Sequence, residues 1–156
     1  LPYGRMMAST IPATKRLRMI GILIITHGTL GESLIHCASH VLNKRPPRLQ
    51  QLGVTAQDDP AMLLPRAHAL VKELDAGEGV LILTDIYGGT PSNMASRLLI
   101  PGKVEAVAGV SLPMLIRVLT YRDRDLPTIV TKAISGGCEG VLRVPLFNVH
   151  NAATGS

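Results

Sequence analysis

The sequence predicts an α/β fold, because stretches typical of buried strands alternate with stretches that have the spacing of amphipathic helices. Two predicted strands also end in polar, glycine-rich turns. The stretch 19–25 leads into His27, and the stretch 79–84 leads into Asp85. We expect a three-layer sandwich with a mainly parallel sheet and right-handed crossovers. Ligands bind at the carboxyl edge of such sheets, so the two polar turns should meet there.

Four stretches are predicted to form the strands, because they are apolar or β-prone and are bounded by Gly, Pro or polar residues. They are residues 19–25, 48–54, 79–84 and 103–110. The first is apolar throughout, which is typical of a strand covered on both faces. A shorter β-prone segment follows at 140–145.

Five stretches have apolar residues at helical spacing. They are residues 32–44, 63–74, 91–99, 112–121 and 126–138. The start signal Asp58-Asp59-Pro60 precedes the second of these. Because Pro65 interrupts its pattern, we expect the regular helix to begin only near that residue.

The net charge of +5 comes mostly from the first 18 residues. These contain four basic residues and no acid, which leaves the remainder with twelve basic and eleven acidic side chains. A nucleic-acid surface would combine clustered cations with aromatic side chains, and the whole chain has three Tyr and one Phe. We therefore expect no nucleic-acid partner.

One folded domain is expected, at residues 19–145. Residues 1–18 read as a disordered basic extension, and residues 146–156 as a flexible tail. The sequence lacks a signal-peptide pattern and an apolar run that could span a bilayer. Cys37 and Cys138 then read as reduced thiols in a cytoplasmic protein.

His27 and Asp85 form the candidate catalytic pair. A neutral imidazole nitrogen is nucleophilic near neutral pH, and the phosphoramidate that it forms gives up its phosphoryl group readily. Asp85 would accept the N–H of the other ring nitrogen, fix the tautomer and stabilise positive charge on the ring. Each residue alone also has a structural reading, as a strand end or a turn. Only their joint placement favours catalysis.

Gly88, Gly89 and Thr90 form the candidate phosphate-binding turn. They lead into a helix that begins at Pro91, and a helix amino end offers unpaired N–H groups to an anion. The glycines allow close approach, and the Thr90 hydroxyl adds a hydrogen bond. A tight turn without a ligand is the structural alternative.

His36 and His40 provide a weaker candidate site. Together with Glu32 they have the i,i+4 spacing that can bind zinc on a helix. This row lies opposite the apolar face, however, where solvated polar side chains are expected, and no further ligand pair is evident. We predict no metal. Because the chain has no Gly-Lys-Ser or Gly-Lys-Thr, we also predict no nucleotide cofactor.

Three motifs resemble, in order, the IIA component of the mannose/fructose family of the bacterial phosphoenolpyruvate-dependent sugar phosphotransferase system. They are residues 24–28, 83–97 and 108–115. The resemblance implies a four-stranded parallel core in the order 2-1-3-4. It also implies an extra carboxyl-terminal strand that is exchanged in a homodimer, a role that residues 140–144 could fill.

The resemblance further implies a phosphotransferase of the carrier kind. The domain 19–145 would accept a phosphoryl group from an HPr-type protein on His27 and pass it to a IIB component, reaching a membrane permease complex only indirectly. Asp85 would bond the histidine, and the Thr90 hydroxyl would lie close to the phosphoryl group. A regulatory module whose phosphorylation state is read by another protein is one alternative. A phosphocarrier for dihydroxyacetone phosphorylation is another.

Overall fold

The computed structural model describes residues 19–147, so the expected basic extension 1–18 and the tail from residue 148 onward lie outside the described residues. Four parallel strands form one sheet in the order β2-β1-β3-β4. Their bounds are β1 Gly21–His27, β2 Leu49–Val54, β3 Val80–Thr84 and β4 Val104–Ala108. The expected α/β class and strand order are confirmed.

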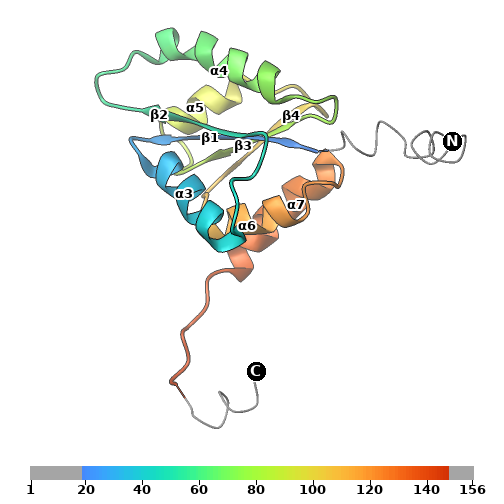
Figure 1. Ribbon diagram of the computed structural model, residues 1–156. Coiled ribbons are helices and arrows are strands. Elements are labelled where there is room, and N and C mark those ends of the chain that lie inside the picture. Colours follow the sequence, from blue (N-terminus) through green and yellow to red (C-terminus); the bar gives the residue numbers. More distant parts are fainter. Residues whose placement is uncertain (1–18, 148–156) are drawn as a thin grey trace, which may run out of the picture.

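Helices cover both faces of the sheet and complete three layers (Figure 1). The helices are α3 Leu30–Leu42, α4 Pro60–Leu74, α5 Thr90–Ser96, α6 Leu112–Thr120 and α7 Leu126–Glu139. Helices α4 and α5 pack on one face, and α3, α6 and α7 pack on the other. In the described part of the chain, no helix is long and apolar enough to cross a bilayer.

The central strand β1 supplies both halves of the core. Ile22 and Ile24 point to the face covered by α3, α6 and α7, and Leu23 and Ile25 point to the face covered by α4 and α5. All four are fully buried. Successive strand residues point to opposite faces, so an apolar run is needed when both faces are covered.

The expectation that the second helix becomes regular only near Pro65 is wrong, because α4 runs from Pro60 through Pro65 without interruption. Asp59 caps this helix by accepting the N–H of Ala61 at 3.0 Å. A proline inside a helix leaves the carbonyl four residues earlier without a partner. Here that carbonyl belongs to Ala61, and both Ala61 and Pro65 are exposed, so water can reach it.

The expected extra strand at the carboxyl end is not formed. Residues 141–147 pair with no strand and extend away from the domain (Figure 1). Their apolar side chains are exposed, with Val144 at 87% and Leu146 at 93%. A strand requires a neighbour for its backbone hydrogen bonds, and the tail contacts no free edge of its own sheet.

A buried arginine closes the amino end of the sheet. The guanidinium of Arg122 donates to the carbonyl oxygens of Ile20 at 2.7 Å, Arg48 at 3.0 Å, and Pro47. Burial lowers the pKa of Arg122 to about 10, helped by the charge of Arg48, so the group stays charged at neutral pH. It ties the start of β1 and the approach to β2 to the turn between α6 and α7.

Candidate functional site

His27 and Asp85 meet at the carboxyl edge of the sheet, as the two strand ends predicted. His27 is the last residue of β1, and Asp85 follows the neighbouring strand β3. The ring Nδ1 of His27 lies 2.8 Å from Oδ2 of Asp85. The backbone N–H of His27 donates to the same oxygen at 2.9 Å. One carboxylate oxygen therefore holds both the ring and the main chain of the histidine.

The carboxylate of Asp85 is stabilised in its ionised form. Burial alone would raise its pKa, but hydrogen bonds from the backbone and ring of His27 and from the Ile86 N–H outweigh burial, so the pKa lies below its ordinary value. An ionised carboxylate only accepts hydrogen bonds, so Nδ1 of His27 must carry the proton. The lone pair is then on Nε2. The side chain of His27 is 53% exposed, against 13% for Asp85.

The backbone around His27 is fixed by hydrogen bonds to neighbouring elements. The N–H of Gly28 donates to the carbonyl of Val54 at 2.8 Å, and Gly28 has a φ of +55°. The buried hydroxyl of Thr26 accepts the N–H of Gly31 at 2.9 Å. A conformation with positive φ favours glycine, which explains why Gly28 follows the histidine. The role of Thr26 was not foreseen, because a threonine in a strand gives no signal of a loop contact.

Gly89 lies against the imidazole ring. A methyl group at this position would be 3.1 Å from Cε1 and 3.6 Å from Nε2 of His27. Gly88 precedes it with a φ of +87°, and Thr90 begins α5. The structure thus brings together His27, Asp85 and Gly89, with Gly88 and Thr90 on either side of Gly89 in the chain.

Thr90 also lines a cavity of about 360 Å³ between α4 and α5. Asp59 at the start of α4 and Arg97 at the end of α5 line the same space. The turn that contains Thr90 therefore borders a hollow that reaches the loop after β2.

Tyr87 does not pack against a neighbouring helix. Its side chain is 87% exposed, and that of Ile86 is 64% exposed. Two large apolar side chains of the turn after β3 thus project into solvent. The sequence indicated an aromatic residue at this turn but not its orientation.

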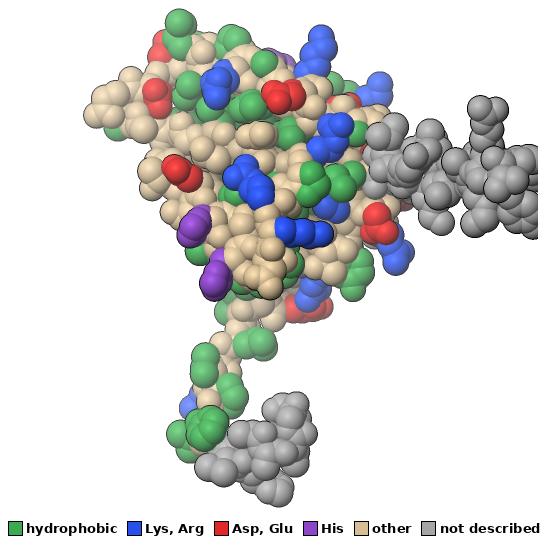
Figure 2. Space-filling view, in the orientation of Figure 1, with side chains coloured by type: hydrophobic (Ala, Val, Ile, Leu, Met, Phe, Trp, Pro, Cys, Tyr) green, Lys and Arg blue, Asp and Glu red, His purple; other side chains and the backbone are tan. Residues whose placement is uncertain are grey.

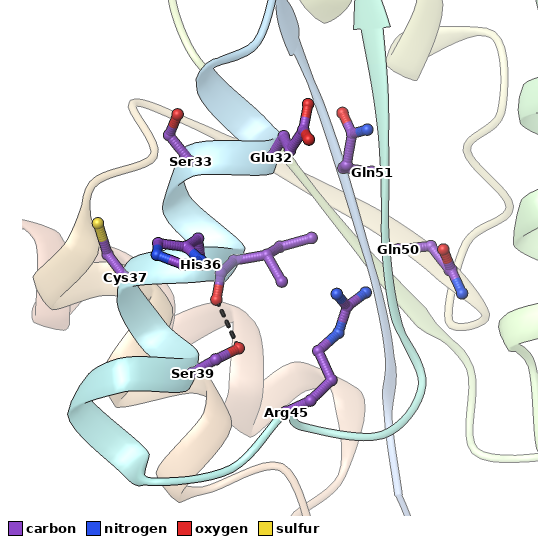
Figure 3. A pocket seen from close by; sticks show the side chains of 9 residues that line it. Glu32, Ser33, His36, Cys37, Ser39, Arg45, Gln50 and Gln51 are labelled. Atoms are coloured by element: carbon purple, nitrogen blue, oxygen red, sulfur yellow. Dashed lines mark hydrogen bonds between the residues drawn. The ribbon is translucent and has the colours of Figure 1, made fainter.

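The row Glu32, His36 and His40 lies on the solvated side of α3, as expected. All three residues are exposed, and histidines appear over α3 in Figure 2. Glu32 and His36 line a groove of about 750 Å³ along β2, where Figure 3 shows Arg45 pointing in from the opposite end. Within residues 19–147, no three potential metal ligands gather into a site.

The sheet and the site together define a class of protein: an open parallel α/β domain that presents a carboxylate-oriented histidine at its carboxyl edge. The family model described as the PTS system fructose IIA component, EIIA-man, matches residues 21–133. The chain belongs to this family, the mannose-type EIIA components of the sugar phosphotransferase system.

Individual relatives agree with this assignment. The chain is 34% identical over 137 residues to the mannose-specific EIIAB component of Escherichia coli K12, covering 86% of this chain and 42% of that protein. It is 26% identical over 119 residues to the transcriptional regulatory protein LevR of Bacillus subtilis, covering 76% of this chain and 12% of that protein. The chain thus spans less than half the length of these relatives.

A solved structure shares the fold. The mannose/sorbose-specific IIA subunit of Enterococcus faecalis superposes with a TM-score of 0.74 at 22% identity, covering 83% of this chain and 98% of that subunit.

Proposed function

We propose that this chain is a phosphohistidine carrier in which Nε2 of His27 accepts a phosphoryl group from an HPr-type protein and passes it to a IIB component. The observation that carries the proposal is the 2.8 Å contact between Nδ1 of His27 and the ionised Asp85, which leaves the lone pair on Nε2 of a half-exposed side chain. Membership of the EIIA-man family supports it.

The transfer step follows from this geometry. The Nε2 lone pair of His27 forms a bond to phosphorus while the bond between phosphorus and the donor's ring nitrogen breaks. The ring of His27 becomes positively charged, and its Nδ1–H strengthens its hydrogen bond to Asp85. In the second transfer a nucleophile of the IIB partner forms a bond to phosphorus while the bond between phosphorus and Nε2 of His27 breaks, and the ring of His27 becomes neutral again. Asp85 does not take up the proton, so it orients and stabilises the ring.

The turn Gly88-Gly89-Thr90 is the proposed place for the phosphoryl oxygens. Gly89 is close to the Nε2 side of the ring, and only a residue without a side chain leaves room there. The hydroxyl of Thr90 and the N–H groups of the turn are donors of the kind that phosphate requires. No metal or nucleotide has a role in this mechanism.

The proposed partners are two proteins, the HPr-type donor and the IIB acceptor, and the proposed setting is the cytoplasm. A membrane permease complex would receive the phosphoryl group only through the IIB component. Sugar recognition then lies outside this chain. Support comes from the family and from the mannose-specific EIIAB protein of Escherichia coli.

A homodimer that exchanges its carboxyl-terminal segment is also proposed. The tail 141–147 exposes apolar side chains that need a partner, and the sheet has two edges. At the β2 edge Arg45 donates to the carbonyl of Leu49 at 3.2 Å, which blocks one free backbone group. The β4 edge carries apolar Val107 and lies under α7, from which the tail departs. We expect the tail of one copy to add to β4 of the other.

Light scattering on the full chain tests the homodimer. We expect a dimer for the native chain and a monomer for the double variant Val141→Asp and Val144→Asp, because charges in the exchanged strand oppose its burial. Val41→Asp, at an exposed position on α3, is the control and should remain dimeric. A native monomer would contradict the proposal.

The carrier function is tested by labelling. With phosphoenolpyruvate and the two general phosphotransferase proteins, the chain should form an acid-labile, base-stable phosphoprotein. His27→Gln should abolish the label, while His36→Gln and His68→Gln, at exposed histidines, should retain it. Labelling of His27→Gln at the native rate would refute the assignment.

A regulatory role is the second candidate, because a segment of LevR is similar to this chain. The same histidine would then be phosphorylated and its state read by another protein. Mixing the phosphorylated chain with a IIB protein separates the two functions. Rapid loss of the label to IIB supports the carrier, and retention supports the regulator. No observation in the structure favours the dihydroxyacetone alternative.

A further inference from the structure

The groove of about 750 Å³ between α3 and β2 runs along an edge of the sheet. Gln50 and Gln51 both line it, and Figure 3 shows their side chains on opposite sides of the strand. Neighbouring residues of a strand point to opposite faces of a sheet, so a groove that both residues line must reach the strand edge between them. The groove therefore includes backbone groups of β2.

The outer edge of β2 has backbone groups without a neighbouring strand. In a parallel pair, alternate residues direct their N–H and C=O groups toward the neighbour. The carbonyls of Arg48 and Val54 accept backbone N–H groups from the β1 segment, at 3.0 Å and 2.8 Å, so the even-numbered residues face β1. An edge of this kind can receive a further strand, because the described sheet has none on that side. The residues that face outward are Leu49, Gln51 and Gly53.

Two hydrogen-bond acceptors lie at one end of the groove. Figure 3 shows the carboxylate of Glu32 directed toward the amide of Gln51. Oε1 of Gln51 is buried and has no hydrogen-bond partner among residues 19–147, and no cation in that range pairs with Glu32. This end is negative and short of donors. It suits an ammonium group, which supplies a positive charge and three N–H donors.

The opposite end of the groove is positive. Arg45 points into the groove there and donates one N–H to the carbonyl of Leu49 at 3.2 Å, which holds the guanidinium beside the strand edge. A guanidinium has five N–H donors, and no carboxylate of the described residues pairs with Arg45. The remaining donors suit a carboxylate, which arginine binds with two parallel hydrogen bonds.

The direction of β2 sets the order of the two charges in a bound strand. Strand β2 begins on the Arg45 side, and α3 begins at the carboxyl edge, so Glu32 lies toward the end of β2. An antiparallel segment therefore meets Glu32 first and Arg45 last. The groove follows α3 from Glu32 to Ser39, which is about 10 Å along the helix. Strand residues four apart lie on one face and about 13 Å apart, which fits this span.

We propose that the groove along β2 binds an extended peptide segment of a partner protein, antiparallel to β2, with a lysine four residues before an acidic residue. The outward backbone groups of Gln51 and Gly53 bind the segment, and Glu32 and Arg45 fix its direction and register. The tail 141–147 does not match, because it contains Arg143 but no acidic residue. The proposal does not depend on phosphorylation of the chain.

Fluorescence anisotropy with two labelled peptides tests the proposal. The forward peptide is acetyl-Thr-Lys-Val-Thr-Val-Glu-Thr-amide, and the reversed peptide is acetyl-Thr-Glu-Val-Thr-Val-Lys-Thr-amide. The two have the same composition and net charge and differ only in the order of the charges. At low ionic strength the full native chain should bind the forward peptide about fivefold more tightly. The preference should shrink near 1 M salt, where the screening length is about 3 Å.

A charge-swapped chain, Glu32→Lys with Arg45→Glu, should prefer the reversed peptide, because the two ends of the groove exchange charge while the net charge stays constant. Arg45→Gln is the milder variant and should lower the native preference to about twofold or less. Lys44→Gln is the matched control. Lys44 precedes Arg45 in the chain but does not line the groove, so the native preference should remain.

Three results would overturn the proposal: a native chain that binds neither peptide, equal binding of both peptides, or a swapped chain that keeps the native preference. The tail of a second copy is the alternative occupant. In that case the tail variant, Val141→Asp with Val144→Asp, would bind both peptides more tightly than the native chain does, which would also contradict the proposal.

Discussion

The two ends of the sheet use the same four strands for different purposes. At the carboxyl end, His27 is half exposed and is held by one carboxylate. At the amino end, Arg122 is buried and is held by three backbone carbonyls. One end thus presents a histidine oriented by a carboxylate to solvent, and the other encloses a charge among main-chain carbonyls. The comparison distinguishes Arg122, which stabilises the sheet, from His27 and Asp85, which the sheet positions at its carboxyl edge.

The charges of the loops follow the same division. Acidic residues and exposed apolar side chains occupy the carboxyl end, whereas Lys44, Arg45, Arg48 and Lys103 belong to the loops at the amino end. Figure 2 shows basic side chains spread over the face that it presents. A near-neutral domain can therefore present opposite potentials at its two ends. The net charge of the chain does not reveal this uneven distribution of acidic and basic residues.

Arg122→Met should have the largest effect and should act on stability only. The variant preserves most of the side-chain volume but removes the donors for three carbonyls, so we expect the free energy of unfolding to fall by about 3 kcal/mol. Urea unfolding measures the loss. Labelling per folded molecule should remain native, and a selective loss of labelling would break the division between the two ends.

Asp85→Asn should slow phosphoryl transfer on the order of 100-fold, because a neutral amide holds the ring without stabilising its positive charge. Single-turnover labelling with phosphorylated HPr measures this effect. The circular dichroism spectrum should stay native. A rate within about twofold of the native protein would show that Asp85 does not orient a nucleophile.

Gly89→Ala should slow labelling about tenfold, because the new methyl group would lie 3.1 Å from Cε1 and partly block the approach to Nε2. Gly77→Ala is a matched control, since nothing lies near its Cβ position and it sits at the other end of the sheet. Because Gly77 has a positive φ, Gly77→Ala should lower the free energy of unfolding but should leave the rate of labelling unchanged. Equal rates for the two variants would contradict the proposed position of the phosphoryl group.

The smallest effect should be the pH dependence of the stability that Asp85 contributes. The folded pKa of Asp85 is lowered, so its ionised form stabilises the fold above the unfolded pKa near 3.8, and this stabilisation is lost as the pH falls through the folded pKa. We expect the native chain to exceed Asp85→Asn in unfolding free energy by about 1 kcal/mol at pH 7. The difference should shrink below about pH 4. A difference that persists in acid would assign the stabilisation to another group.

The meeting of His27 and Asp85 was predictable, because strand ends in a parallel sheet lie at one edge and both residues are polar residues after apolar runs. The shared Oδ2 was not predictable, since a sequence does not show which donors reach one oxygen. Arg122 was missed for a similar reason: its partners are backbone carbonyls, which carry no side-chain signature. Pro65 was misread because a helix tolerates a proline where the freed carbonyl faces water.

Oδ2 of Asp85 accepts hydrogen bonds from both the ring and the backbone amide of His27. A change in the charge of the ring therefore affects a backbone hydrogen bond at the end of β1. When the ring gains positive charge, its hydrogen bond to Oδ2 of Asp85 becomes stronger, and the hydrogen bond from the amide of His27 to the same oxygen becomes weaker. On the proposed carrier function, phosphorylation of His27 should therefore shift the NMR resonance of its own amide proton.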